Sequence, residues 1–349
     1  MPSAGSGVVP RRRVTRLIDR AAACRLTVLA APAGSGKTVA CANSASGGTG
    51  WLTLAESDND AAALRARLDA ALPGAVTLVL DDVHMLTDDG ALRELDQVIS
   101  HTPPSLRIIL SGRYMPGLRL AKLRVAGEVA EIGAAELACT ADEADAVFAA
   151  AAIGPAERDE LLSYTRGWIT GLRLAALTGG GPGFGANPLA ADYLRDEVLD
   201  AQPPDIRQFM LRTSVAERLT GEIADSLTGG LMNGAVMLDT LARENCFIDR
   251  LGGGEYRYYP VLRDMLVAEL SRQCPAEEPG PPGGRVAPLS PSELAVLRLL
   301  PSFLTNQEIA EALFLSVNTV KTHLRSIYRK LAATSRRQAI ANGRRLRLL

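Results

Sequence analysis

The 349-residue sequence predicts three parts in order: an α/β domain built on a parallel sheet, an all-α region, and a small four-helix domain. Three observations lead to this prediction. Short apolar runs alternate with helical stretches through residues 1–140, which is typical of buried parallel strands. Residues 141–274 are rich in helix formers and contain few strand signals. Residues 275–288 are rich in proline and glycine, which indicates a linker before residues 289–349.

Five apolar runs are the candidate strands of the first domain. Each is only a few residues long and is separated from the next by a helical segment, as expected for a doubly covered parallel sheet. The runs are residues 26–30, 51–54, 76–80, 106–111 and 129–132.

The composition excludes several classes of protein. Hydrophobic residues make up 47% of the chain and charged residues 22%, which is typical of a globular protein. No apolar run reaches the roughly 18 residues that a membrane span needs, and residues 1–13 lack the apolar stretch of a secretory signal. The five cysteines are scattered without CxxC spacing. We therefore expect a cytoplasmic protein with reduced thiols, no zinc site and no membrane partner.

The charge of the chain is unevenly distributed. Residues 285–349 hold eleven Lys and Arg against three Glu, a net charge of +8. The remaining residues carry 27 basic and 36 acidic side chains, a net charge of −9. A basic end on an acidic body is the electrostatic pattern of a protein that binds nucleic acid by that end. Charge alone leaves open the alternative of a merely solvated basic tail.

Residues that start helices recur four times in residues 289–349. Two capping boxes, each a Ser or Thr followed three positions later by Glu, open the first two helices, and a serine caps the third. The starting residues are Ser290, Thr305, Ser316 and, for the fourth helix, Thr334 or Ser335. The second and third helices are joined by only a few residues, so they are predicted to form a helix-turn-helix.

The third of these helices is expected to enter the major groove of DNA, N-terminal residues first. Its apolar stripe would face the domain core, which leaves polar and basic side chains on the opposite face. Lys and Arg can reach guanine or phosphate, and Thr can meet a thymine methyl group. The candidate residues are Asn318, Thr319, Lys321, Thr322 and Arg325 for the bases, with Arg329 and Arg336 for phosphates.

This segment resembles the LuxR-type helix-turn-helix of bacterial regulators. The matching strings are Leu-Thr-Asn-Gln-Glu-Ile-Ala (304–310), Leu-Ser-Val-Asn-Thr-Val-Lys-Thr-His-Leu (315–324) and Tyr-Arg-Lys-Leu (328–331), with correct spacing throughout. The resemblance implies double-stranded DNA as a partner and supports Lys321, Thr322 and Arg325 as base-facing residues. The alternative is a small helical bundle that binds no DNA, for which both the motif and the basic face would have to be accidental.

A phosphate-binding loop follows the first candidate strand. Ala31-Pro32-Ala33-Gly34-Ser35-Gly36-Lys37-Thr38 fits the pattern GxxxxGK[ST] except that Ala31 replaces the first glycine. Its backbone N–H groups and the following helix N-terminus would face an anion. Lys37 would reach the outer phosphates and Thr38 a magnesium ion. The candidate nucleotide-binding residues here are Ala33, Gly34, Ser35, Gly36, Lys37, Thr38 and Val39.

Charged residues follow two further strands. The run 76–80 ends in Asp81 and Asp82. Asp81 would hold magnesium, directly or through water, and Asp82 would polarise a water molecule. Arg113 follows the run 106–111 and would sense a terminal phosphate. Taken alone, two acids at a strand end indicate a simple turn and Arg113 a surface arginine, but the loop upstream favours the catalytic interpretation. Any such activity is at most that of a slow regulatory ATPase.

Together these motifs resemble the ATPase of the MalT-like group of LuxR regulators, which are signal-transducing (STAND) ATPases. Val9-Pro10-Arg11-Arg12-Arg13 is similar to the family's Pro-Arg segment near the nucleotide, and Gly167-Trp168-Ile169-Thr170-Gly171-Leu172 to its Gly-Trp-Pro helical motif. The resemblance implies ATP or ADP and Mg²⁺ as cofactors, with Arg11 and Arg13 beside the nucleotide. It also implies a winged-helix-like part within residues 141–274.

The chain departs from the family pattern in several places. The family usually has a long helical-repeat sensor where only residues 275–288 stand here. Tyr259 replaces a histidine that would contact the diphosphate of the resting state, and a neutral tyrosine brings no positive charge. Ile169 replaces the motif proline, and residues 59–76 are short for the family.

The leading hypothesis is a DNA-binding transcription regulator that ATP or ADP switches, acting as a homo-oligomer on DNA. RNA polymerase is a further expected partner. The alternative is a DNA-binding regulator whose nucleotide domain is a scaffold that does not switch, which the missing sensor and Tyr259 motivate. A helicase or AAA machine is a third hypothesis, and the sequence contains no further helicase motif to support it.

Overall fold

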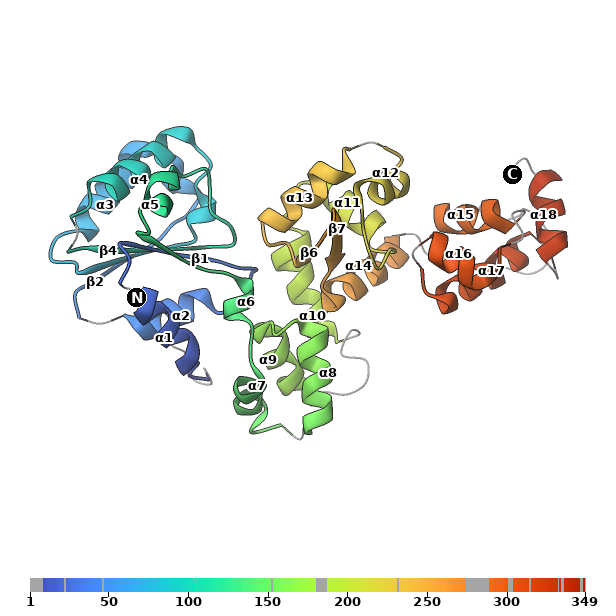
Figure 1. The fold of residues 1–349 in the computed structure, drawn as a ribbon, viewed down its shortest axis with the longest axis horizontal. Helices are drawn as coiled ribbons and strands as arrows, with labels where there is room; N and C mark the ends of the chain where they lie inside the picture. Colours follow the sequence, from blue (N-terminus) through green and yellow to red (C-terminus); the bar gives the residue numbers. More distant parts are fainter. Residues whose placement is uncertain are drawn as a thin grey trace. The chain divides into compact units, whose positions relative to one another are not determined.

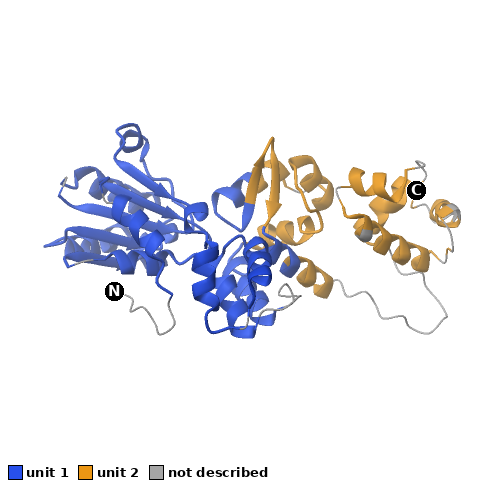
Figure 2. Ribbon diagram, turned by 60° about the horizontal axis from the view of Figure 1, so that its bottom comes forward, with its two compact units in different colours: residues 1–202, 239–248, 259–265 blue, residues 203–238, 249–258, 266–349 orange. Residues whose placement is uncertain are grey.

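The computed structural model describes most of the chain and divides it into two compact units (Figure 2). Unit 1 comprises residues 1–202, 239–248 and 259–265, and unit 2 comprises residues 203–238, 249–258 and 266–349. The units interleave along the chain, and the domain boundaries predicted at residues 140, 274 and 288 remain predictions. The predicted linker 275–288 lies outside the described residues, which are 9–21, 23–45, 47–103, 105–151, 153–179, 187–230, 232–273, 289–300, 304–313, 315–331, 333, 336–345 and 348.

A five-stranded parallel sheet forms the first part of unit 1 (Figure 1). The strand order is β2-β3-β4-β1-β5, and every neighbouring pair is parallel. The five predicted strands and the parallel sheet are therefore confirmed, with ends shifted by no more than two residues. The strands are β1 (Leu26–Ala30), β2 (Thr49–Thr53), β3 (Thr77–Asp81), β4 (Arg107–Gly112) and β5 (Val129–Ile132).

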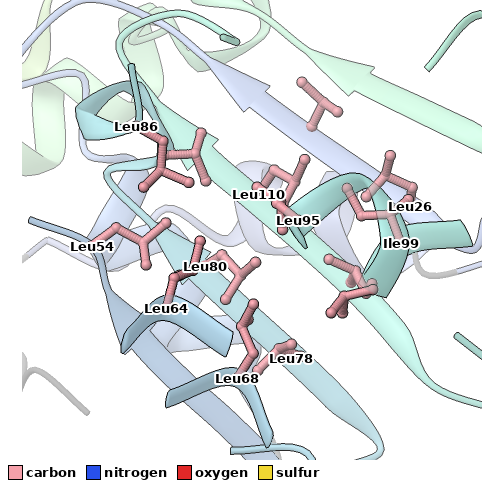
Figure 3. Close-up of a cluster of buried hydrophobic side chains, with 14 of the residues drawn as sticks. Leu26, Leu54, Leu64, Leu68, Leu78, Leu80, Leu86, Leu95, Ile99 and Leu110 are labelled. Atoms are coloured by element: carbon pink, nitrogen blue, oxygen red, sulfur yellow. The ribbon is translucent and has the colours of Figure 1, made fainter. Parts of the chain in front are cut away.

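Helices cover both faces of this sheet because successive strand residues point to opposite sides. On one face, Leu78 and Leu80 pack with Leu64 and Leu95 from helices α3 and α4 (Figure 3). On the other face, Val79 belongs to a second core cluster with α1 and α2. The helices are α1 (Arg12–Ala21), α2 (Lys37–Ser44), α3 (Ala61–Ala71), α4 (Asp89–His101) and α5 (Ala121–Val125).

A helical part completes unit 1. Its elements are α6 (Ala134–Leu137), α7 (Ala141–Phe148), α8 (Pro155–Thr165), α9 (Ile169–Thr178), α10 (Pro188–Leu194) and a π-helical turn, Arg195–Leu199. The glycine before Trp168 is needed for two reasons. Gly167 has a φ of +70°, and a Cβ atom there would lie 2.8 Å from the backbone nitrogen of Cys139. The close approach lets the Cys139 N–H donate to the Gly167 carbonyl at 2.8 Å, which ties α9 to the start of the helical part.

Three helices and a β-hairpin follow. They are α11 (Pro204–Thr213), α12 (Gly221–Thr228), α13 (Gly234–Arg243), β6 (Ile248–Gly252) and β7 (Glu255–Tyr258), before α14 (Pro260–Gln273). An antiparallel bridge joins Leu219 to Tyr256. Helices followed by a hairpin agree with the expected winged-helix-like part. The hairpin corrects the expectation of few strands, because a short strand with charged residues on its open face gives little apolar signal.

The C-terminal domain has the four predicted helices: α15 (Pro291–Leu299), α16 (Asn306–Ala312), α17 (Val317–Lys330) and α18 (Arg336–Arg345). The capping boxes at Ser290 and Thr305 are both present, and Ser316 caps α17. Val296, Leu297, Ile309, Val320 and Ile327 form its buried centre. Within the described part of the chain, none of the helices combines the length and apolarity needed to cross a membrane.

Candidate nucleotide and DNA sites

The carboxyl ends of three neighbouring strands bring the predicted phosphate-binding residues together. The loop after β1 leads to Lys37 at the start of α2, Asp81 ends β3, and Arg113 follows β4. In a parallel sheet these ends lie along one edge, where ligands of such folds bind. The order β3-β4-β1 places the three groups at adjacent positions on that edge.

The loop between β1 and α2 is a tight turn that ends at a helix N-terminus. Gly34 has a φ of +69° and Gly36, which precedes α2, a φ of +84°. Both lie in the left-handed region that glycine adopts without strain. A Cβ atom at Gly34 would also lie 2.6 Å from Thr170 Oγ1. The glycines thus allow a close turn whose following helix directs its free N–H groups at an anion.

Lys37 lies buried inside this turn. Its Nζ donates to the carbonyl oxygens of Ala31 at 2.7 Å and of Pro32 at 3.0 Å. Burial lowers the pKa of Lys37 to about 8, although the charges of Asp81 and Asp82 act in the opposite direction. The ammonium group is therefore close to its titration range and gains from a bound anion, which would favour the charged form.

The two predicted magnesium ligands are in direct contact. Thr38 Oγ1 donates to Asp81 Oδ2 at 2.7 Å. A hydroxyl and a carboxylate oxygen beside a phosphate loop are the hard donors that Mg²⁺ uses together with phosphate oxygens. Among the residues that the structure describes, no group of three or more His, Cys, Asp or Glu side chains could hold a metal by itself.

Asp82 is held in a strained backbone conformation with a φ of +58°. Burial and the neighbouring charge of Asp81 raise the pKa of Asp82. The neighbouring His84, which the sequence analysis did not select, packs its ring edge-on against Tyr114 with centroids 5.8 Å apart. Burial lowers the pKa of His84 to about 4, so its ring is neutral near pH 7.

Arg113 is held by a residue that the sequence analysis missed. Its Nη1 donates to the Glu197 carbonyl oxygen at 2.6 Å, and its Nη2 to Glu197 Oε2 at 2.8 Å. The Arg113 carbonyl oxygen accepts a hydrogen bond from Asn245 Nδ2 at 2.7 Å. Glu197 lies 84 residues further along the chain, in the π-helical turn, so no local motif could have indicated the pair.

These groups surround a cavity of about 380 Å³. This volume lies within the range of small-molecule sites in proteins. Nine predicted residues line it: Arg11, Ala33, Gly34, Gly36, Lys37, Thr38, Val39, Asp82 and Arg113. Ser35, Arg13 and Asp81 do not. The lining residues that sequence reasoning missed are Val9, Val14, Thr15, Ala40, Asn43, Ile169, Thr170, Arg173, Tyr193 and Glu197.

The start of α9 closes over the phosphate-binding loop. Trp168 Nε1 donates to the Ala33 carbonyl oxygen and Thr170 Oγ1 to that of Gly34, both at 2.8 Å. The Trp168 ring also packs edge-on against Phe247, with centroids 5.1 Å apart. Two side chains from one helix start therefore fix two successive peptide groups of the loop.

Tyr259 lies outside the 380 Å³ cavity. It lines a small separate pocket together with Pro32, Ser35 and Trp168. Its ring packs edge-on against Phe247 at 5.5 Å, and its N–H donates to the Phe247 carbonyl oxygen at 2.8 Å. The residue that replaces the family histidine therefore lies behind the phosphate-binding loop.

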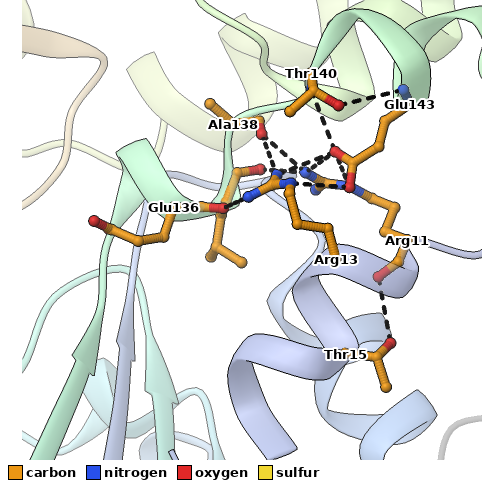
Figure 4. A network of polar contacts seen from close by, with 8 residues as sticks. Arg11, Arg13, Thr15, Glu136, Ala138, Thr140 and Glu143 are labelled. Atoms are coloured by element: carbon orange, nitrogen blue, oxygen red, sulfur yellow. Dashed lines mark hydrogen bonds and ion pairs between the residues drawn. The ribbon is translucent and has the colours of Figure 1, made fainter. Parts of the chain in front are cut away.

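Arg11 and Arg13 form an internal polar network (Figure 4). Both guanidinium groups pair with Glu143 Oε2, at 2.8 Å from Arg11 and 3.1 Å from Arg13. Both also donate to the Ala138 carbonyl oxygen. Burial alone would raise the pKa of Glu143, but the hydrogen bonds from Arg13 and Arg11 hold it below its ordinary value. The predicted role of the two arginines beside the nucleotide stays a prediction, and their observed role is to join α1 to α7.

Glu143→Gln is expected to lower the free energy of unfolding by about 1–2 kcal/mol, because it removes the charge that both arginines share. The Glu143 side chain is only 12% exposed, so water compensates little for the loss. Asp145→Asn is a matched control on the same helix, since Asp145 pairs with Arg158 but is 58% exposed; it should change stability by less than about 0.5 kcal/mol. Urea unfolding of both variants measures the difference, and equal values would contradict the network's role.

The predicted DNA-binding face lies along α17. Lys321, Thr322, Arg325 and Arg329 are exposed. Thr319 is half-buried, and its hydroxyl is 2.8 Å from that of Ser316, the cap of the helix. The side chain of Asn318 lies outside the described part of the structure. The exposed basic side chains therefore lie on the face opposite Val320, Leu324 and Ile327, which are buried.

Arg336 makes contacts within the domain. Its Nε and Nη2 donate to the Leu300 carbonyl oxygen, at 3.0 Å and 2.9 Å, and its Nη1 to that of Leu304 at 2.6 Å. These bonds join the start of α18 to the segment between α15 and α16. Carbonyl acceptors of this kind cannot be recognised from residue types, so the sequence indicated only an arginine available to phosphate. That contact stays a prediction.

Two family models match the C-terminal half of the chain. Residues 195–278 match the MalT winged helix domain, and residues 287–342 match the bacterial regulatory proteins of the luxR family. Eight residues separate the two matches. The matched regions contain the helices and hairpin of the winged-helix-like part and most of the four-helix domain.

Curated relatives have the same combination. The HTH-type transcriptional regulator MalT of Yersinia pestis is 29% identical over 326 residues, which cover 76% of this chain and 36% of the relative. MalT of Serratia proteamaculans is 30% identical over 327 residues, covering 78% and 36%. The chain thus spans just over a third of the length of these relatives. A solved STAND protein with a tetratricopeptide repeat sensor from Pyrococcus horikoshii aligns with 95% of this chain and 54% of its own, at 15% identity and a TM-score of 0.39.

Proposed function

We propose, because the chain carries both a MalT-type winged-helix domain and a luxR-family regulatory domain, that it is a DNA-binding transcription regulator that ATP or ADP controls. The observation on which the proposal rests is a phosphate-binding cavity and a basic recognition helix in one chain. The names of the relatives support transcription regulation, and the cavity supports the nucleotide.

The DNA-binding part of the proposal is supported by α17. It is the second helix of a helix-turn-helix, and it presents Lys321, Thr322 and Arg325 on an exposed face. These side chains can donate to guanine or phosphate and contact a thymine methyl group. Arg329 is one turn further along and is suited to the phosphate backbone. Paired half-sites would require two copies of the chain, so we expect a homo-oligomer on DNA.

The nucleotide part is supported by the residues that converge on the cavity. Backbone N–H groups of the loop 31–38 and Lys37 would hold the phosphates, and Thr38 and Asp81 would hold Mg²⁺. The bound nucleotide would supply the anionic charge that these donors otherwise lack. Asp82 would position water, and Trp168 and Thr170 would transmit the state of the loop to the helical part.

A second candidate function is a DNA-binding regulator with a nucleotide domain that serves only as a scaffold. Two observations favour it. Arg113 is already engaged by Glu197, and Tyr259 packs behind the loop without bringing a positive charge to the cavity.

One experiment separates the two functions. Purified protein is tested against a genomic fragment library without nucleotide, with ADP, and with a non-hydrolysable ATP analogue, at one fixed salt concentration. Specific binding that appears with only one nucleotide supports the switch. Equal specific binding in all three conditions supports the scaffold, and absence of specific binding in all three contradicts DNA recognition itself.

Nucleotide affinity is expected to fall with increasing pH. Burial lowers the pKa of Lys37 to about 8, so the ammonium donor is mostly charged at pH 7 and mostly neutral at pH 9. Because each pH unit above a pKa reduces the charged fraction about tenfold, the dissociation constant for ADP should rise about tenfold between pH 7 and pH 9. Calorimetry over this range measures it. A constant affinity would show that charged Lys37 is not needed.

A further inference from the structure

The Arg113–Glu197 pair lies in the wall of the nucleotide cavity. Both residues line it, and the Arg113 guanidinium bonds to both the backbone and the side chain of Glu197. The Arg113 side chain is 29% exposed and that of Glu197 47%. The pair is therefore accessible from the cavity and can be rearranged by a ligand without unfolding the core.

The backbone around the pair fixes its geometry. Glu197 lies in the π-helical turn Arg195–Leu199, a conformation that is rare and often found at functional sites. Arg113 follows β4, and its carbonyl oxygen is held by Asn245. Both partners are thus positioned by the fold and do not depend on a chance meeting of flexible side chains.

The carboxylate of Glu197 adds negative charge to a site built for an anion. Burial is the main cause that raises the pKa of Asp82, and the charges of Asp81 and Glu197 add to it. Burial also raises the pKa of Tyr193, again with a contribution from Glu197. The charge of Glu197 therefore acts on groups at other points of the cavity wall.

We propose that Glu197 is a specificity-determining residue that makes this site favour a nucleoside diphosphate over the triphosphate. The inference rests on the nucleotide site proposed above. A terminal phosphate would compete with the carboxylate for the same guanidinium and would be repelled by it. A diphosphate held by Lys37 and the loop N–H groups leaves the Arg113–Glu197 pair intact.

The test compares dissociation constants for ADP and a non-hydrolysable ATP analogue, both with Mg²⁺, by calorimetry on the full chain. Glu197→Gln keeps the size of the side chain and removes its charge. The ratio of the ATP-analogue constant to the ADP constant is expected to fall about tenfold, the usual effect of one charged hydrogen bond. Asp192→Asn is the control, because Asp192 pairs with Arg195 one turn before Glu197 and does not line the cavity; its ratio should equal that of the wild type.

The outcomes separate this inference from the proposed function. If both nucleotides bind and the ratio is the same in Glu197→Gln as in wild type, Glu197 does not select between them, while the nucleotide site stands. An equal gain in affinity for both ligands overturns the inference in the same way. If wild type binds neither ADP nor the ATP analogue, the nucleotide site itself is wrong.

Discussion

Lys37→Ala is expected to abolish nucleotide binding, with dissociation constants for ADP and ATP rising about 100-fold or more. The Lys37 Nζ lies inside the phosphate-binding turn, 2.7 Å from the Ala31 carbonyl oxygen, and is buried. A charge-assisted hydrogen bond to phosphate in such a site contributes on the order of 3 kcal/mol, which corresponds to about 100-fold in affinity. Calorimetry with each nucleotide is the measurement.

Lys122→Ala is the matched control for this variant. Lys122 is an exposed lysine of the same α/β part, on α5, and does not line the cavity. Removing it changes the net charge by the same amount, so its nucleotide affinity should equal that of the wild type. If Lys37→Ala retained wild-type affinity while remaining folded, the assignment of the nucleotide to this cavity would be wrong.

The double variant Lys321→Ala/Arg325→Ala is expected to weaken specific DNA binding about 100-fold. Each exposed basic side chain on the recognition helix contributes about 1–3 kcal/mol when it contacts a base, and the two are on the same face of α17. If a variant side chain contacts a phosphate, the slope of log affinity against log salt should also fall by about 1 for each contact. Titrations of a specific fragment at several salt concentrations measure both effects.

Arg298→Ala controls for the loss of positive charge. Arg298 is exposed on α15 of the same four-helix domain, outside the helix-turn-helix. Its removal should change affinity severalfold at most, and equally for specific and unrelated DNA. A loss in the double variant no larger than that of two such controls would contradict the assignment of α17 as the recognition helix.

Features that depend on local sequence were predicted well. The strands of the sheet were recognised because buried parallel strands are short, continuous apolar runs, and β1 and β5 begin and end at the predicted residues. The caps at Ser290 and Thr305 were recognised because their bonding partners, Glu293 and Glu308, lie three residues away. The loop at Gly34 and Gly36 was recognised because its backbone geometry requires glycine.

Features that depend on distant partners were not predictable in the same way. Glu197 reaches Arg113 from a turn in the helical part, and nothing in the residues around it indicates a phosphate site. The same limit applies to Arg11 and Arg336, whose roles depend on acceptors 132 and 36 residues away. An arginine in a sequence indicates a donor, and only the fold shows which acceptor it meets.

The two hydrogen bonds from Trp168 and Thr170 have a mechanical consequence. They end on consecutive carbonyl groups, Ala33 and Gly34, so neither peptide plane of the loop can rotate without breaking a bond to the start of α9. Loop and helix thus share a single degree of freedom. Since each residue turns a helix by about 100°, one residue inserted between Trp168 and Thr170 would move the hydroxyl off its acceptor. The spacing of this pair is therefore as strongly constrained as the glycines of the loop, although no ligand need ever touch it.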